Sequence, residues 1–230
     1  MAKELTSSDV DALVRSVGVD EWGVACNDPQ LPMTPALPTA ISLLTRLEPM
    51  ELEGVELGPT LAYYAGYKRV NATLDAAVSQ LTTAFRSAGW LAENVASTIP
   101  EDQYDAIDDW CSVPVFPHKT AATLAGLGWI GKTALFVSPE FGPRVRLATV
   151  FTDFPMRPGI AIDTGRCAAC RLCVDACPAH AGVDVTWRSE LPREALYNVK
   201  ACEQETSKYE NLGGICGVCI AVCPWGRERR

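Results

Sequence analysis

The stretch CAACRLCVDACP, residues 167–178, decides the fold of the C-terminal third of this chain. Its cysteines follow the spacing Cys-x2-Cys-x2-Cys-x3-Cys-Pro. The two-residue spacers let the first three thiolates converge on one face of a small metal cluster, while the three-residue spacer and the proline direct the fourth thiolate away. The stretch therefore predicts a [4Fe–4S] cluster beside a second one that takes the fourth cysteine.

A second run, CGVCIAVCP at residues 216–224, has the spacing Cys-x2-Cys-x3-Cys-Pro and lacks a cysteine three residues before Cys216, where Gly213 stands. Cys202 is the nearest thiol left to complete a set of four. Crossing the last cysteine of each run gives two ligand sets. Cluster 1 is assigned to Cys167, Cys170, Cys173 and Cys223, and cluster 2 to Cys177, Cys202, Cys216 and Cys219.

Disulfides and zinc sites are the two alternatives to iron–sulfur clusters for these thiols. A secreted disulfide scaffold would be shorter and would spread its cysteines, whereas eight of the ten fall between residues 167 and 223. Zinc ribbons also use Cys-x2-Cys pairs, but they need neither a triplet nor a crossed ligand. The two remaining cysteines, Cys26 and Cys111, are expected to be small core residues by default.

The composition limits the partners. The formal net charge is −8, which argues against a large nucleic-acid footprint and makes a tRNA partner doubtful. No run approaches 18 consecutive apolar residues, so no membrane span is predicted. The N-terminus MAKELTSSDVDALV lacks the apolar segment of a signal peptide, and a cytoplasmic protein is expected.

Hydrophobic periodicity predicts an α+β fold, with a layered domain at residues 1–158 and a ferredoxin-like double-cluster domain at residues 159–230. A capped helix is expected from Ser7 or Ser8 to Gly18, and helices over residues 60–89 and 120–125. Strands are expected over residues 22–26, 40–44, 134–137 and 145–152.

The segment GLGWIGKT, residues 126–133, matches the phosphate-loop pattern G-x-x-x-x-G-K-[ST] and also contains G-x-G-x-x-G. Both motifs need a strand before the glycines and a helix after them, so that the helix N-terminus faces the phosphate. Here a helix is predicted before the glycines and a strand after them, and Lys132 would open that strand. Nucleoside triphosphate binding is therefore not expected.

The stretch FPHKTAATLAGLGWIGKTALFVSPEFGPRVRLATVFTD, residues 116–153, together with the two cysteine runs, resembles the epoxyqueuosine reductase family, which is related to the corrinoid reductive dehalogenases. The resemblance covers roughly residues 5–225 and is specific at AGLGWIGK and the eight cysteines. It implies an N-terminal domain like the nitroreductase-type flavin enzymes and the vitamin B12-processing protein. It also implies a base-off cobalamin over the sheet, supplied with electrons by the nearer cluster.

The chain departs from the tRNA-modifying members, because it stops seven residues past Cys223 where they have a further helical-repeat domain. Counting back from Pro114 puts Cys111 at the position of their catalytic aspartate, with Asp108 and Asp109 nearby.

Candidate residues follow from the loop and the glycine-rich turn. Cys111, His118 and Lys119 are the candidate catalytic residues, with His118 as a proton donor or, alternatively, a packed loop histidine. The candidate cofactor contacts are Gly128, Trp129, Gly131 and Lys132, although Trp129 is as well explained as a core residue.

Three functions are compatible with these features. The first is a corrinoid-dependent reductase that takes electrons from a low-potential ferredoxin or flavodoxin and acts on a small-molecule substrate. The second is a ferredoxin-type electron carrier, against which the large N-terminal domain argues. The third is a corrinoid or flavin chaperone that reduces its cargo, with flavin as the alternative cofactor.

Overall fold

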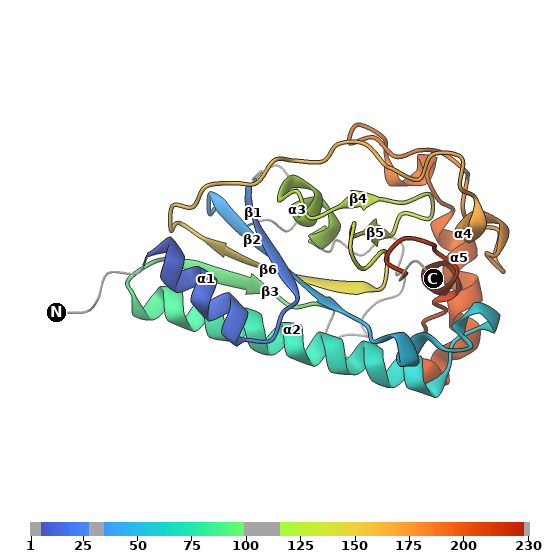
Figure 1. The fold of residues 1–230 in the computed structure, drawn as a ribbon, viewed down its shortest axis with the longest axis horizontal. Coiled ribbons are helices and arrows are strands. Elements are labelled where there is room, and N and C mark those ends of the chain that lie inside the picture. The colour runs from blue at the N-terminus through green and yellow to red at the C-terminus, as the bar shows by residue number, and fades with distance from the viewer. Residues whose placement is uncertain (1–5, 28–34, 99–115, 228–230) are drawn as a thin grey trace.

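The computed structural model describes residues 6–27, 35–98 and 116–227, and a four-stranded antiparallel sheet lies at its centre (Figure 1). The strand order is β1-β2-β6-β3. The strands are β1 (Glu21–Cys26), β2 (Thr39–Arg46), β3 (Ala92–Val95) and β6 (Val145–Thr152). Each neighbouring pair is antiparallel, with Ile41 of β2 opposite Val150 of β6. The structure thus has the mixed helix and sheet content that the sequence predicts.

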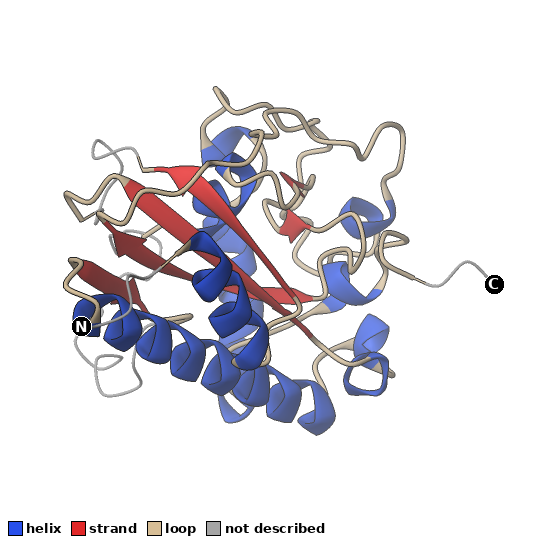
Figure 2. Ribbon diagram, turned by 60° about the vertical axis from the view of Figure 1, so that its left-hand side comes forward, coloured by secondary structure: helices blue, strands red, loops and turns tan. Residues whose placement is uncertain are grey.

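Helices cover both faces of the sheet (Figures 1 and 2). On one face, α1 (Ser7–Ser16) and α2 (Leu61–Ser87) pack on Ile41, Leu43 and Val150. On the other face, α3 (His118–Leu124) packs on Ala40 and Phe151. Seven consecutive residues of β2 are therefore buried, which explains why its sequence, TAISLLTR, does not alternate between apolar and charged residues.

The long helix α2 follows the predicted pattern closely. Thr60 is its N-cap, and the Thr60 hydroxyl accepts a hydrogen bond from the backbone N–H of Tyr63 at 3.1 Å. Leu74, Leu81 and Phe85 recur at helical spacing and are at most 1% exposed. The helix ends before Gly89, which has a φ of +91° that favours glycine.

The structure differs from the predicted elements around the glycine-rich segment. Instead of one strand over residues 134–137, a small hairpin pairs β4 (Trp129–Ile130) with β5 (Phe136–Val137). Lys132 lies in the hairpin turn rather than at the start of a strand. Two-residue strands are too short to produce an alternating pattern, and β3, also not predicted, has polar Glu93 and Asn94 at its centre.

The cysteine-rich segment contains only short helices, and α4 and α5 lie together at one end of the molecule (Figure 1). They are α4 (Leu172–Asp175), α5 (Val199–Thr206) and α6 (Val218–Ala221), with 3₁₀ turns η4 (Arg193–Ala195) and η5 (Ser207–Leu212). Two further 3₁₀ turns, η1 (Pro49–Leu52) and η2 (Val55–Leu57), precede α2. The division at residue 158 stays a prediction, and the hydrophobic core crosses it: Trp187 packs with Trp129, and Ala221 joins the core under α2. Among the described helices none is both long and apolar enough to cross a membrane.

Candidate metal centre

The eight clustered cysteines lie around α4, α5 and α6. All nine cysteines in the described part of the chain are free thiols, so the disulfide interpretation is excluded for them. Each of the eight is partly buried, whereas Cys26 in β1 is exposed rather than a core residue, contrary to the prediction. Cys111 lies outside the described residues.

One group of four thiols borders a small cavity. Its walls are formed by Cys167, Cys170, Cys173 and Cys223, with Pro224 and Trp225. Burial, followed by the nearby thiols of Cys173 and Cys167, raises the pKa of Cys223 to about 11. Two segments about 50 residues apart in sequence thus meet at one site, as the crossed assignment of cluster 1 requires.

The other four thiols influence one another in the same way. Burial raises the pKa of Cys219 to about 12, and the thiols of Cys216, Cys202 and Cys177 add to this effect. Burial also raises the pKa of Cys216, with Cys202 and Cys177 as contributors. These are the four residues assigned to cluster 2. The thiol of Cys173, from the first group, also contributes to the raised pKa of Cys219, so the two groups adjoin.

The chemistry of these donors suits iron–sulfur clusters. Thiolates are the ligands of [4Fe–4S] clusters, and the positive charge of bound iron would offset the raised pKa of buried thiols such as Cys219 and Cys223. No three His, Cys, Asp or Glu side chains in the described ranges have the arrangement of a single-ion site.

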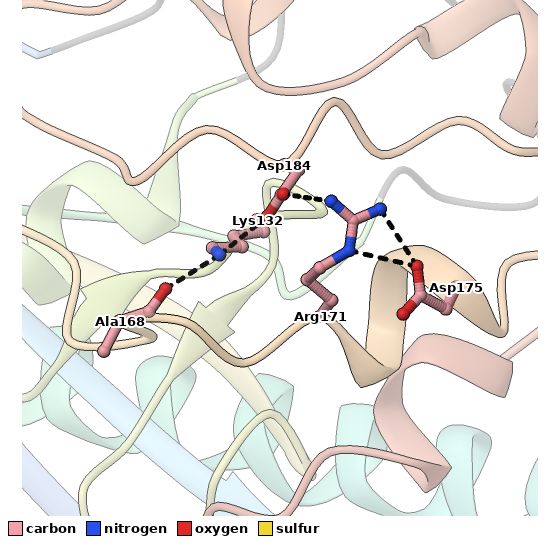
Figure 3. A network of polar contacts seen from close by, with 5 residues as sticks. All are labelled: Lys132, Ala168, Arg171, Asp175 and Asp184. Carbon is pink, nitrogen blue, oxygen red and sulfur yellow. Dashed lines mark hydrogen bonds and ion pairs between the residues drawn. The ribbon is translucent and has the colours of Figure 1, made fainter.

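Lys132 of the glycine-rich segment holds the loop that carries the first cysteines (Figure 3). Its ammonium group is buried and donates to the Ala168 carbonyl at 2.8 Å and to Asp184 Oδ1 at 2.7 Å. Asp184 also pairs with Arg171, which in turn pairs with Asp175 at 3.1 Å. Ala168 and Arg171 lie inside the Cys167–Cys173 loop, so this network fixes three of the predicted ligands of cluster 1.

Arg144 holds the opposite side of the same site. Its guanidinium group donates to the backbone carbonyls of Ala221, Cys223 and Trp225. The arginine is 9% exposed. Sequence reasoning missed this residue because its partners lie 77 to 81 positions away, and no local pattern marks such a contact.

Tyr197 and Glu205 were also missed and lie beside the second group. The Tyr197 hydroxyl forms a hydrogen bond with the Cys202 thiol. The Glu205 carboxylate is buried, accepts from Lys208 at 2.6 Å and from the Tyr209 hydroxyl at 3.1 Å, and contributes to the raised pKa values of Cys202 and Cys216.

The structure places His118 in a packing environment. Its Nε2 lies 2.9 Å from the Ala96 carbonyl and its Nδ1 2.9 Å from the Thr149 hydroxyl. Because a carbonyl only accepts, Nε2 carries the proton and Nδ1 accepts from Thr149. Burial lowers the pKa of His118 to about 4, so the ring is neutral at pH 7 with both nitrogens in use. This favours the packed histidine over the proton donor.

The buried His118 gives a testable pH dependence of stability. The pKa of His118 in the folded protein, about 4, lies below the ordinary histidine pKa of 6.5, so the unfolded state binds more protons between these two pH values. Neutral His118 therefore contributes up to about 3 kcal/mol to the free energy of unfolding. This contribution is complete above about pH 6.5 and is lost as the pH falls towards 4. Melting temperatures from pH 7.5 to 4.5 should fall more steeply for the wild type than for His118→Gln, whose amide still donates to Ala96. Parallel curves would contradict this.

Lys119 follows His118 and faces the hairpin. Its Nζ donates to the Ala134 carbonyl at 2.7 Å. Although the residue has exposed surface, protein around the ammonium group, with smaller contributions from Arg193 and Arg146, lowers its pKa to about 8. The structure describes two of the candidate catalytic residues, His118 and Lys119. The pKa of Lys119, about 8, is closer to neutral pH than that of His118, about 4, so Lys119 is the better candidate proton donor.

The four candidate cofactor contacts are packed inside the protein. Trp129 is fully buried, with its ring 4.7 Å from that of Trp225 in an edge-to-face arrangement. A Cβ on Gly128 would lie 2.2 Å from the Val137 carbonyl oxygen, and one on Gly131 would lie 3.9 Å from Cys167 Sγ. With Lys132 engaged by Asp184, this segment supports the cluster 1 loop and leaves no free side chain for another cofactor.

Comparison with known proteins supports a double 4Fe-4S cluster domain at the cysteine-rich segment. Residues 166–226 match the family model described as 4Fe-4S double cluster binding domain. The chain is 36% identical over 118 residues to the tetrachloroethene reductive dehalogenase of Sulfurospirillum multivorans, covering 45% of this chain and 22% of that protein. It is 32% identical over 145 residues to the epoxyqueuosine reductase of Pseudomonas aeruginosa, covering 61% of this chain and 39% of that protein.

Solved structures share the fold. A catabolic reductive dehalogenase superposes with a TM-score of 0.74 at 21% identity, over 96% of this chain and 32% of that one. An epoxyqueuosine reductase with a modified tRNA stem loop gives a TM-score of 0.60 at 16% identity, over 96% and 65%. The chain spans about two fifths or less of the two curated relatives. It is a relative of the reductive dehalogenases and the epoxyqueuosine reductases that carries a double 4Fe-4S cluster binding domain.

Proposed function

We propose that this protein is an iron–sulfur reductase that moves electrons through two [4Fe–4S] clusters to a cofactor and substrate at its α+β domain. The observation that carries the proposal is the gathering of eight thiols into two adjoining groups of four. The first group borders a cavity. Cys219 of the second group lies close enough to Cys173 of the first for that thiol to raise its pKa. Adjoining clusters allow an electron to pass from one to the other inside the protein.

The roles of the residues follow from their positions. Cys167, Cys170, Cys173 and Cys223 would hold cluster 1, and Cys177, Cys202, Cys216 and Cys219 would hold cluster 2. When bound, the clusters supply one-electron transfer at low potential. Lys132 and Arg144 fix the two loops that bring the ligands of cluster 1 together. Trp225 and the buried Trp129 exclude water from this side of the site.

A base-off cobalamin is the proposed cofactor of the α+β domain. One structure with the same fold is titled as suggesting a mechanism for B12-dependent dehalogenation, at 21% identity and a TM-score of 0.70. The packed residues Gly128, Trp129, Gly131 and Lys132 do not fit as its contacts. Lys119 remains a candidate proton donor beside the hairpin.

The proposed partners are a low-potential ferredoxin or flavodoxin as electron donor and a small-molecule substrate. Relatives differ in this respect, since one dehalogenase structure holds 3-bromo-4-hydroxybenzoic acid and one epoxyqueuosine reductase structure holds a tRNA stem loop. The net charge of −8 favours the small molecule over tRNA.

Anaerobic reconstitution tests the proposed function. We expect about eight iron atoms and eight acid-labile sulfides per chain. Hydroxocobalamin should then bind with a base-off spectrum, and Lys119→Met should slow turnover while leaving the iron content unchanged. About two zinc ions without sulfide would refute the clusters.

The cofactor is tested separately from the clusters. Loaded clusters with tight flavin binding and no corrinoid binding would point to a flavin reductase. Loaded clusters that bind neither cofactor would favour the electron carrier.

A further inference from the structure

We propose that Arg144 holds the reduction potential of cluster 1 above that of cluster 2, so that electrons entering the protein collect at cluster 1. This inference rests on the proposed function, because it requires both clusters. The reduction potential of such a cluster depends on the charge around it, on hydrogen bonds to its sulfurs and on its exposure to solvent. The first of these factors differs between the two sites.

Arg144 places an uncompensated positive charge at cluster 1. Its three hydrogen-bond acceptors are neutral carbonyls, and one of them belongs to Cys223, whose thiol borders the cavity. No carboxylate pairs with Arg144 in the described ranges. A positive charge at 9% exposure is weakly screened, so it stabilises the extra electron of a reduced cluster.

The other charges around cluster 1 largely cancel. Lys132 and Arg171 are matched by Asp184 and Asp175 in the network of Figure 3. Two more cations lie nearby, Arg166 at 5.4 Å from the centre of the Trp129 ring and Arg227 at the Ala221 carbonyl, but both are exposed and therefore well screened, which leaves the buried Arg144. The charge that remains at this site is positive.

The charge beside cluster 2 has the opposite sign. The Glu205 carboxylate is 8% exposed and contributes to the raised pKa values of Cys202 and Cys216. Its partner Lys208 has a side chain that is 64% exposed and therefore well screened. The negative end of this ion pair thus lies inside and the positive end in solvent, which disfavours reduction of cluster 2.

Hydrogen bonds to the cysteines and the solvent exposure of the cysteines do not offset the difference in charge between the two cluster sites. At cluster 1, Cys173 has hydrogen bonds from Thr133 and from its own backbone, and Cys223 has one from the backbone at Trp225. At cluster 2, Cys202 has a hydrogen bond from Tyr197, Cys216 has one from the backbone at Val218, and Cys177 accepts from the Ala181 N–H at 3.4 Å, so each group has three. All eight cysteines have intermediate exposure. The fixed charges therefore decide the order of the potentials.

The resulting electron path has a direction. With Arg144 beside cluster 1 and Glu205 beside cluster 2, one electron received at cluster 2 from a low-potential ferredoxin or flavodoxin would pass to cluster 1. The transfer would oxidise the donor centre and reduce the acceptor, with no proton needed.

A redox titration followed by electron paramagnetic resonance tests the proposal on the reconstituted full chain. The signals are assigned with Cys202→Ala, which should lack cluster 2. In the wild type, cluster 1 should be reduced first. In Arg144→Gln, the ratio of reduced to oxidised cluster 1 at a fixed solution potential should fall about tenfold, equal to about 59 mV for one electron, while cluster 2 is unchanged. Arg144→Lys keeps the charge and should restore most of that ratio.

Two further variants keep the test decisive. Arg15→Gln removes an exposed cation on α1 and should leave both potentials unchanged. Glu205→Gln should raise the potential of cluster 2 and narrow the gap, which tests the charge argument even if Arg144→Gln cannot hold cluster 1. A wild type in which cluster 2 is reduced first, or equal shifts in Arg144→Gln and Arg144→Lys, would overturn the proposal. A protein without iron would instead refute the proposed function.

Discussion

Replacing Cys202 with alanine should halve the iron content of the reconstituted protein, from about eight to about four atoms per chain. Cys202 is the least obvious of the eight proposed ligands, because it lies 14 residues before Cys216 and outside both runs. It is in α5, whose N-cap Asn198 accepts from the Ala201 N–H at 3.1 Å. Loss of its thiol leaves three ligands for cluster 2 and all four for cluster 1.

Two further variants make this prediction specific. Cys223→Ala should lose the other four irons, and the double variant should lose nearly all eight. Cys26→Ala is the matched control, since this free thiol is exposed in β1 and should leave the iron unchanged. Iron and sulfide analysis with electron paramagnetic resonance measures each case. An unchanged iron content in Cys202→Ala would show that the fourth ligand of cluster 2 lies elsewhere.

The prediction of the two cysteine groups rests on local information in the sequence. The spacing of a run restricts where its thiolates can point, and the same reasoning joined Cys223 to the first run across about 50 residues. The long secondary-structure elements were also predictable. Strand β6 begins and ends at the predicted residues, and each end of helix α2 lies within two residues of its predicted position.

Residues with non-local partners could not be predicted. Arg144 gains its role from carbonyls about 80 positions away, and the Lys132 partner Asp184 lies 52 positions away. In sequence, each is an ordinary cation in a turn. The short strands β3, β4 and β5 were missed or misplaced for a similar reason, since two to four residues form a strand here only because a partner strand is present.

The glycine-rich segment matches the letters of a phosphate-loop motif, but its glycines have a different role in the structure, which is packing. The order of elements argues against a phosphate loop, because α3 precedes the glycines and the β4–β5 hairpin follows them. The structure supplies the reason for the glycines. Gly128 lies against the backbone of Val137 and the ring of Phe136, so that the two short strands of the hairpin can approach.

Replacing Gly128 with alanine should therefore destabilise the protein strongly. The added Cβ would lie 2.2 Å from the Val137 carbonyl oxygen and 2.6 Å from Phe136 Cζ, and the backbone oxygen cannot move aside cheaply. Overpacking of this kind costs about 3 kcal/mol or more, which lowers the melting temperature of a protein of this size by about 10 °C. Gly131→Ala is the matched control. Its Cβ would meet the side chain of Val137 at 3.1 Å and would lie 3.6 Å from the Leu135 carbonyl oxygen, an ordinary contact distance, so it should cost far less.

Thermal melting of the reconstituted variants, at one scan rate, separates the packing role of these glycines from nucleotide binding. ATP with magnesium should leave the melting temperature of the wild type unchanged, because a ligand raises it only by binding the folded state. The Lys132 ammonium group already donates to Ala168 and Asp184 and has no need of a phosphate. Equal melting temperatures for Gly128→Ala and Gly131→Ala would contradict the packing role. A rise with ATP that disappears in Lys132→Ala would show that the segment binds phosphate after all.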